Sequence, residues 1–167
     1  LVCNVGSGRA NPPGRETPED WQRMLALNLT ATTQTVGTMT ELLARSSGSI
    51  VCISSICGVE ALGCPVPYAA AKAALNAYVR TSARPLARRG VRINAVAPGN
   101  IVFPGSVWEQ KLAADAAQVR AMLDREVALA RLGTAAEIAD WVAFLSSARA
   151  SFATGQIFVV DGGQVRS

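Results

Sequence analysis

Short apolar runs rich in β-branched residues alternate along this chain with longer stretches in which apolar residues recur at helical spacing. The short runs have the length of buried strands and the longer stretches that of helices. The expected strands are residues 1–4, 48–55, 91–96 and 157–160. The expected helices are residues 17–45, 67–89 and 106–129, and one that begins at Thr134. Strands that alternate with helices in this way predict a parallel sheet joined by crossover helices.

Residues typical of helix ends mark where several of these helices begin and stop. Thr17 and Asp20 have the spacing of a capping box at the start of the first helix, and Thr134 and Glu137 have it at the start of the last. Gly90 directly follows the second helix, where a glycine commonly ends one. These signals support the helix boundaries that the apolar pattern predicts.

The expected topology places several polar and turn residues along one edge of the sheet. Right-handed crossovers are the default for strand-helix-strand units, and ligands bind such sheets beyond the carboxyl ends of the strands. Asn4, Ser55 and the turn Pro98-Gly99 each follow a strand. We therefore predict one α/β domain over residues 1–167, a doubly wound parallel sheet with a functional site at this edge.

Composition and charge narrow the classes of partner. Half of the 167 residues are apolar, but no apolar run has the ~20-residue length of a membrane span, so we expect no membrane partner. The net charge is +4, but the arginines are scattered, and a group of them (Arg84, Arg88 and Arg89) complements the carboxyl end of a helix. Because no basic stripe is interleaved with aromatic residues, we expect no nucleic-acid partner.

The absence of histidine removes several catalytic mechanisms. Ser-His-Asp and Cys-His catalysis and most zinc sites need an imidazole, and we expect no metal site. No Cys-x-x-Cys pair occurs among the four cysteines, Cys3, Cys52, Cys57 and Cys64. Their apolar strand and loop surroundings indicate reduced thiols and hence a cytoplasmic location. We expect Cys57 and Cys64 to serve packing rather than chemistry.

Tyr68 and Lys72 place a phenol and an ammonium on one face of the second long helix, because residues four apart share a helix face. Such a pair is common on protein surfaces, and alone it proves little. Two further polar residues favour a functional role for this pair over a surface position. Ser55 stands at a strand end thirteen residues before Tyr68, and Asn28 lies amid leucines in the first helix.

This set resembles the short-chain dehydrogenase/reductase family, in its shorter single-domain branch, from Leu1 to about Gly163. The segment Tyr68-Ala-Ala-Ala-Lys72 is similar to the family's most specific motif, and the turns Pro98-Gly99-Asn100-Ile101 and Asp161-Gly162-Gly163 end later strands. The resemblance implies the carboxyl-terminal part of a Rossmann-like domain. It also implies a catalytic tetrad, formed by Asn28, Ser55, Tyr68 and Lys72.

The same resemblance implies a nicotinamide cofactor, NAD or NADP. The residues that it assigns to cofactor binding are Asn4, Gly6, Tyr68, Lys72, Pro98, Gly99 and Ile101. Lys72 would hold the ribose hydroxyls, and the Ile101 backbone would face the carboxamide. The chain departs from the family pattern at Cys3, Val5 and Phe103. Because Phe103 stands where the family often has Thr, a more apolar pocket wall is expected there.

The expected chemistry also follows from the side chains themselves. Reduction of a carbonyl by hydride transfer needs a proton donor for the developing alkoxide, and oxidation of an alcohol needs the reverse. A free tyrosine has a pKa of about 10, so we expect the Lys72 ammonium to lower the pKa of Tyr68 in a shielded cleft. Ser55 would donate a hydrogen bond to the substrate oxygen. By the resemblance, Asn28 would anchor a water that relays protons to Lys72, and a purely structural hydrogen bond is the alternative.

The glycine-rich dinucleotide loop of the family is not found in this sequence. Gly6-Ser7-Gly8 follows a strand but leads into prolines rather than into a helix. In the family the loop precedes this region by roughly 85 residues, and the chain does not begin with Met. We therefore expect residues upstream of Leu1, among them those that select NAD or NADP.

These observations lead to one main functional hypothesis. The protein is expected to interconvert a carbonyl and an alcohol in a small molecule, with Tyr68 as the proton donor or acceptor. A 3-oxoacyl reductase and a sugar or surface-glycan-related reductase both fit, and the alternative is a non-catalytic binding or scaffold subunit of the same family. Because both long helices are apolar on more than one face, we expect a homodimer or a homotetramer.

Overall fold

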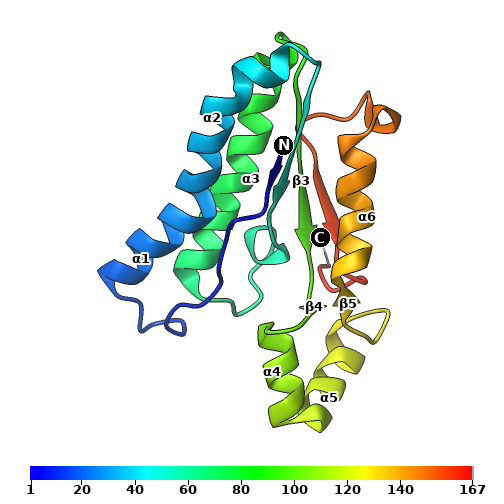
Figure 1. Cartoon of the computed structure of the whole chain (residues 1–167). Coiled ribbons are helices and arrows are strands. Elements are labelled where there is room, and N and C mark those ends of the chain that lie inside the picture. The colour runs from blue at the N-terminus through cyan, green and yellow to red at the C-terminus, as the bar shows by residue number, and fades with distance from the viewer. Residues whose placement is uncertain (167) are drawn as a thin grey trace.

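The computed structural model describes residues 1–166 and shows a four-stranded sheet with helices on both faces (Figure 1). Its strands are β1 (Val2–Cys3), β2 (Ser49–Ile53), β3 (Arg92–Pro98) and β6 (Ile157–Val160). They lie in the order β1-β2-β3-β6, and every neighbouring pair is parallel. The doubly wound α/β architecture predicted from the sequence is therefore confirmed.

The helices divide between the two faces of the sheet. They are α1 (Pro18–Leu25), α2 (Ala31–Ala44), α3 (Val66–Ala87), α4 (Val107–Ala114), α5 (Ala116–Glu126) and α6 (Ala135–Ser146). Helices α2 and α3 cover one face and α6 covers the other (Figure 1). Apolar side chains of β2 and β3 point alternately to the two sides, so Ile50 and Ile93 pack toward α2 and α3, whereas Val51 and Val96 pack toward α6.

Both predicted capping boxes are present, at Thr17 with Asp20 and at Thr134 with Glu137. The first long helix differs from the expectation, because a π-helical turn over Ala26–Thr30 separates α1 from α2. Such turns widen a helix by one residue and are frequent at functional sites. The turn contains Asn28, whose side chain is fully buried.

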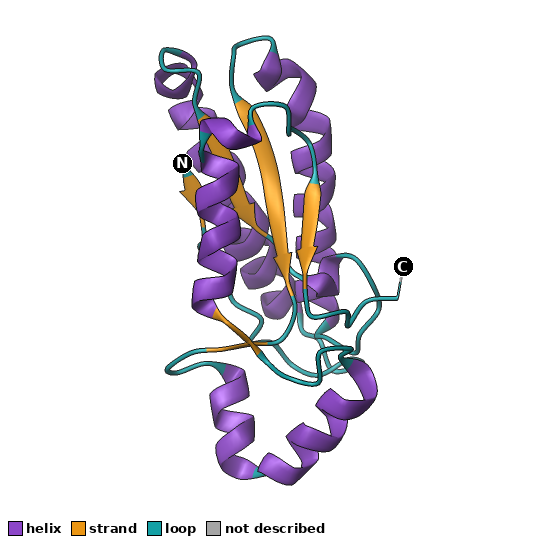
Figure 2. Cartoon of the chain, turned by 90° about the vertical axis from the view of Figure 1, so that its right-hand side faces the viewer, coloured by secondary structure: helices purple, strands orange, loops and turns teal. Residues whose placement is uncertain are grey.

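The segment between β3 and α6 lies beyond the carboxyl ends of the strands, where α4 and α5 form a V-shaped projection (Figures 1 and 2). The expected single helix over residues 106–129 is broken at Asp115, which caps the start of α5. Two short strands, β4 (Ile101–Val102) and β5 (Gly133–Thr134), pair in parallel at the base of this projection. Within residues 1–166 no helix is long and apolar enough to cross a membrane.

Candidate active site

The carboxyl end of β2 leads directly into the segment that carries Ser55. The strand ends at Ile53, and Ser55 caps a single 3-10 turn over Ile56–Gly58. The hydroxyl of Ser55 accepts a hydrogen bond from the backbone amide of Cys57 at 3.2 Å. Gly58 lies so close to α3 that a β-carbon there would be 2.6 Å from the carbonyl carbon of Lys72. The serine is thus held on a short turn packed against the helix that bears Tyr68 and Lys72.

Tyr68 lies in the first turn of α3, beside Ser55. Burial raises the pKa of Tyr68 above its usual range, and a hydrogen bond with the Ser55 side chain acts in the opposite direction but is the weaker influence. The expected lowering of the Tyr68 pKa by Lys72 is therefore not what this arrangement produces. A phenol with a raised pKa is protonated at neutral pH.

Lys72 is buried on the same face of α3, with 4% of its surface exposed. Its ammonium donates a hydrogen bond to the carbonyl of Ile53 at 2.7 Å and lies 5.9 Å from the centre of the Tyr68 ring. Burial lowers the pKa of Lys72 to about 8. The side chain is thus still mostly cationic at neutral pH, in contact with the strand end that precedes Ser55.

Asn28 connects the first turn of the chain to this cluster. Its side-chain oxygen accepts from the Ser7 amide at 3.1 Å, and its side-chain nitrogen donates to the Ser7 and Met24 carbonyls, each at 3.0 Å. A β-carbon at the neighbouring Gly6 would lie 2.7 Å from the Asn28 oxygen and 3.3 Å from the Lys72 nitrogen. Asn28 therefore holds the backbone of this turn next to Lys72.

The predicted cofactor residues lie along the same edge but in different environments. Gly6 contacts the Asn28 and Lys72 side chains, whereas Asn4 is exposed at the end of β1. The Gly99 amide donates to the Val160 carbonyl at 3.0 Å, and a β-carbon at Gly99 would lie 2.7 Å from Asp161. Packing against the end of β6 is thus a sufficient reason for glycine at this position.

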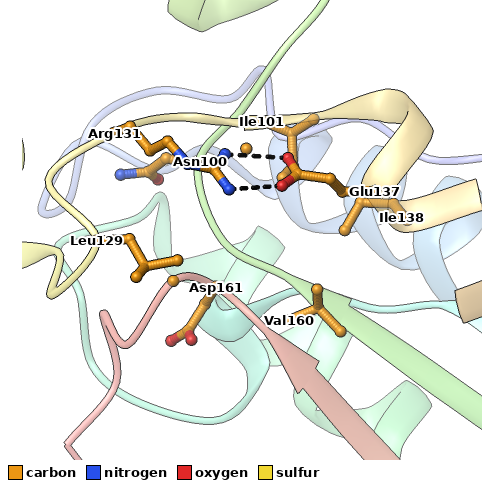
Figure 3. Close-up of a pocket in the computed structure, with 10 residues that line it drawn as sticks. Asn100, Ile101, Leu129, Arg131, Glu137, Ile138, Val160 and Asp161 are labelled. Carbon is orange, nitrogen blue, oxygen red and sulfur yellow. Dashed lines mark hydrogen bonds and ion pairs between the residues drawn. The ribbon is translucent and has the colours of Figure 1, made fainter. Parts of the chain in front are cut away.

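Ile101 belongs to β4 and lines a pocket of about 110 Å³ beside the Pro98-Gly99 turn (Figure 3). Arg131 and Glu137 form a two-pronged ion pair in its wall, with nitrogen–oxygen distances of 2.6 and 3.1 Å. The remaining lining residues are Asn100, Leu129, Gly133, Ile138, Val160, Asp161 and Gly162. Because none of the tetrad residues lines this pocket, it is not the place of proton transfer.

Two polar residues that the sequence analysis did not single out join the site. Asn76, one turn after Lys72 on α3, accepts a hydrogen bond from the Ser54 hydroxyl at 2.6 Å and donates one to the Gly58 carbonyl at 3.0 Å. Both Ser54 and Asn76 are buried. The spacing of Tyr68, Lys72 and Asn76, four residues apart each time, is the sequence signal that could have identified Asn76.

The prediction of four reduced cysteines is wrong for two of them. Cys57 and Cys64 form a disulfide that closes the loop between Ser55 and Tyr68. Cys3 and Cys52 are free and buried on adjacent strands, as expected for packing residues. The two cysteines lack the short Cys-x-x-Cys spacing, and the loop between them folds back and brings them together from seven positions apart. With one disulfide present, the cysteines no longer indicate a cytoplasmic location.

A second hollow, of about 420 Å³, lies between α4 and α5. Trp108, Lys111 and Met122 are among its lining residues, and the Lys111 ammonium lies 4.3 Å from the centre of the Trp108 ring. This cation–π contact holds the two side chains together in the wall of the hollow.

Known proteins resemble this chain over almost its whole length. The family profile described as enoyl-(acyl carrier protein) reductase matches residues 1–164. The chain is 37% identical over 165 residues to 2-(S)-hydroxypropyl-CoM dehydrogenase 3 of Xanthobacter autotrophicus, covering 98% of this chain and 64% of that protein. It is 36% identical over 164 residues to 3-oxoacyl-[acyl-carrier-protein] reductase of Escherichia coli, covering 98% and 65%.

Solved structures superpose closely on the chain. A 3-oxoacyl-[acyl-carrier protein] reductase from Brucella melitensis with bound NAD matches with a TM-score of 0.83 and 32% identity, over 99% of this chain and 62% of that one. An NADPH-bound short chain oxidoreductase from Pseudomonas aeruginosa matches with a TM-score of 0.91 and 29% identity, over 100% and 65%. This chain thus spans slightly less than two thirds of the length of these relatives. On the profile match and these identities, it belongs to the short-chain dehydrogenase/reductase family.

Proposed function

We propose that the protein containing this chain is an NAD(P)-dependent oxidoreductase that reduces a carbonyl to an alcohol, with Tyr68 as the proton donor. The observation that carries the proposal is the meeting of Ser55, Tyr68 and Lys72 at the carboxyl edge of the sheet, with Ser55 near enough to influence the pKa of Tyr68 and Lys72 within 5.9 Å of the Tyr68 ring centre. A hydroxyl and a phenol side by side can both donate to one substrate oxygen. That arrangement suits stabilisation of an oxyanion followed by its protonation.

The charge states favour the reducing direction. Because burial raises the pKa of Tyr68, the phenol holds its proton at neutral pH and can give it to a developing alkoxide. The nearby Lys72 ammonium then stabilises the phenolate that is left, since opposite charges attract strongly in a partly buried site. The pKa of Lys72, about 8, leaves it mostly charged at the pH where this attraction is needed.

The residues of this edge fit a nicotinamide cofactor. Lys72 has two N–H groups beyond the one bonded to Ile53, and they can donate to the ribose hydroxyls of a nucleotide. Lys72 and the Ile101 backbone would hold the cofactor, which would supply the hydride. The NAD and NADPH in the two solved relatives support this choice without selecting between them.

The substrate class proposed is a 3-oxoacyl thioester. Two of the relatives reported above are 3-oxoacyl-[acyl-carrier-protein] reductases, although a third acts as a hydroxypropyl-CoM dehydrogenase. A sugar-related substrate is the alternative, because L-sorbose reductase of Gluconobacter frateurii and a putative 2-deoxy-d-gluconate 3-dehydrogenase of Agrobacterium tumefaciens are also structural relatives. A homodimer or homotetramer and a cytoplasmic location also remain proposals, and the Cys57–Cys64 disulfide weighs against the second.

The test is to mix the full-length protein with acetoacetyl-coenzyme A and with NADPH or NADH, and to follow oxidation of the reduced cofactor by its absorbance. Turnover is expected with at least one cofactor. In Tyr68→Phe, kcat should fall by about 10²–10⁴-fold, the usual worth of a general acid, while the dissociation constant of the cofactor stays within about threefold. Retained turnover in Tyr68→Phe would refute the role of Tyr68. A wild-type protein that binds neither cofactor would favour the scaffold alternative.

A further inference from the structure

Asn76 bonds to both sides of the turn that carries Ser55. Its side-chain oxygen accepts from the Ser54 hydroxyl at 2.6 Å, and its side-chain nitrogen donates to the Gly58 carbonyl at 3.0 Å. Ser54 precedes Ser55 directly, and Gly58 ends the 3-10 turn that Ser55 caps. Asn76 is 2% exposed, so neither hydrogen bond can be replaced by bulk water.

The other contacts that tie this turn to the rest of the chain each lie on one side of Ser55; the Ser54 amide, for example, donates to the Val96 carbonyl at 2.7 Å. Lys72 holds the carbonyl of Ile53, before the two serines. The Cys57–Cys64 disulfide ties the far side of the loop to the residues that lead into α3. None of these contacts spans Ser55 itself. The amide of Asn76 does, because its two hydrogen bonds fall on either side of that residue.

We propose that Asn76 is a positioning residue that clamps residues 54–58 onto α3 and thereby sets the place of the Ser55 hydroxyl relative to Tyr68. This inference rests on the proposed function, since it concerns the alignment of two proton-donating groups on one substrate oxygen. Tyr68 and Asn76 lie two helical turns apart on α3. The helix therefore fixes the distance between the phenol and the residue that holds the turn.

The chemistry of the clamp requires an amide. An acceptor must face the Ser54 hydroxyl and a donor must face the Gly58 carbonyl, and asparagine carries both in one rigid plane. Aspartate would offer no donor to Gly58 and would place a charge one helical turn from Lys72. Alanine would leave a buried hydroxyl and a buried carbonyl unsatisfied, and the turn would move to recover those hydrogen bonds.

The test compares Asn76→Ala with a matched control, Asn94→Ala, in the full-length protein. Asn94 is as deeply buried and also uses both ends of its amide, donating to the Ala153 carbonyl and accepting from the Gln156 amide, but it lies in the middle of β3 away from the turn. Asn76→Ala should lower kcat for acetoacetyl-coenzyme A by about tenfold or more, since small displacements of catalytic groups are costly. KM and the cofactor dissociation constant should stay within about twofold. Asn94→Ala should lose stability without a comparable loss of kcat.

Hydrogen exchange supplies a readout that does not depend on turnover. Exchange of the Cys57 and Gly58 amides, which bond to the Ser55 hydroxyl and carbonyl, should accelerate in Asn76→Ala and not in Asn94→Ala. If Asn76→Ala does not fold, Ser54→Ala is the second variant, because it removes one of the two hydrogen bonds by deleting a single oxygen atom. The fall in kcat and the faster exchange at Cys57 and Gly58 are expected there too, but smaller.

The outcomes separate this inference from the proposed function. An active wild type whose Asn76→Ala variant keeps its kcat, or loses it only in step with Asn94→Ala, overturns the positioning role. An inactive wild type is a failure of the proposed function, visible before any variant is compared. In that case unchanged exchange at Cys57 and Gly58 overturns the clamp, whereas faster exchange supports it.

Discussion

At the scale of single residues, burial disfavours the charged forms of both Tyr68 and Lys72, and this has a consequence for stability. The pKa of Lys72 falls from its usual 10.5 to about 8 in the folded chain. Between these values the unfolded chain binds more protons than the folded one, so the free energy of unfolding should rise with pH. The burial cost is fully present below about pH 8, and the rise should reach at most roughly 1.4 kcal/mol per pH unit.

Urea unfolding at several values between about pH 7.5 and pH 9.5 measures this rise. The raised pKa values of Tyr68 and of the Cys52 thiol act in the opposite sense, above about pH 10 for the tyrosine and above about pH 8.5 for the thiol, where the unfolded groups lose their protons. Lys72→Met keeps the apolar stem and removes the titrating group, so the difference in the free energy of unfolding between wild type and variant should shift in favour of the wild type as the pH rises through this window. An identical pH dependence in the variant and the wild type would show that the Lys72 pKa is not lowered.

The residues of the candidate tetrad were predictable from the sequence, because their spacing and their positions at strand ends are features of the sequence itself. Ser55, Tyr68 and Lys72 do converge, and Asn28 reaches them through the Ser7 backbone. The direction in which the Tyr68 pKa shifts was not predictable. It depends on whether burial of the phenol outweighs the attraction of the nearby ammonium. Asn76 was missed for a similar reason, because its hydrogen-bond partners are fixed only by the folding of a loop.

At the scale of elements, the close approach of the 3-10 turn to α3 should make Gly58 intolerant of any side chain. A β-carbon at Gly58 would lie 2.6 Å from the Lys72 carbonyl carbon and 2.8 Å from the Ala73 nitrogen, both backbone atoms that cannot rotate away. Gly58→Ala should therefore lower the free energy of unfolding by about 1–3 kcal/mol and also reduce kcat, because it pushes Ser55 away from Tyr68.

Gly37 in α2 is the control for Gly58. A β-carbon there would meet no atom within 4 Å, so Gly37→Ala should raise the free energy of unfolding by about 0.5–1 kcal/mol through helix propensity alone. Urea unfolding measures both variants. Equal stability of Gly58→Ala and the wild type would contradict the described packing of the turn on α3.

The disulfide acts on the same connection between β2 and α3. Closing a loop of eight residues, Cys57 to Cys64, restricts the unfolded chain and should stabilise the fold by roughly 2.5 kcal/mol. A dithiol reductant should lower the free energy of unfolding of the wild type by about this amount. The variant with both Cys57→Ser and Cys64→Ser should not respond. Peptide mapping without reduction should find the two cysteines linked, and recovery of both as free thiols would refute the disulfide.

The elements themselves were predictable to the extent that they carry a repeating pattern or a cap. The strands β2 and β6 and the helices with capping boxes lie where the sequence placed them. The pair β4 and β5 has two residues in each strand, too few to show alternation. The break at Asp115 was also missed, because alanines on both sides of it favour a continuous helix as strongly as two short ones.

At the scale of the whole molecule, apolar side chains remain exposed on opposite sides of the sheet. Leu25 and Leu42 are exposed on α1 and α2, and Trp141, Phe144 and Phe152 are exposed on or just after α6. Phe152 has no protection from solvent at all. Exposed apolar groups of this size commonly mark association surfaces, and two separate faces allow either a dimer or a tetramer.

We therefore expect the full-length protein to show the mass of a homodimer or a homotetramer in light scattering, and one variant on each face decides between them. Phe152→Asp and Leu42→Asp each place a charge on an exposed apolar position, which should disfavour burial there while leaving the core of the subunit intact. In a tetramer that uses both faces, each variant should leave a dimer. In a dimer, only the variant on the interface that is used should give a monomer, and the other should keep the wild-type mass. A monomeric wild type would mean that these apolar residues are exposed for another reason.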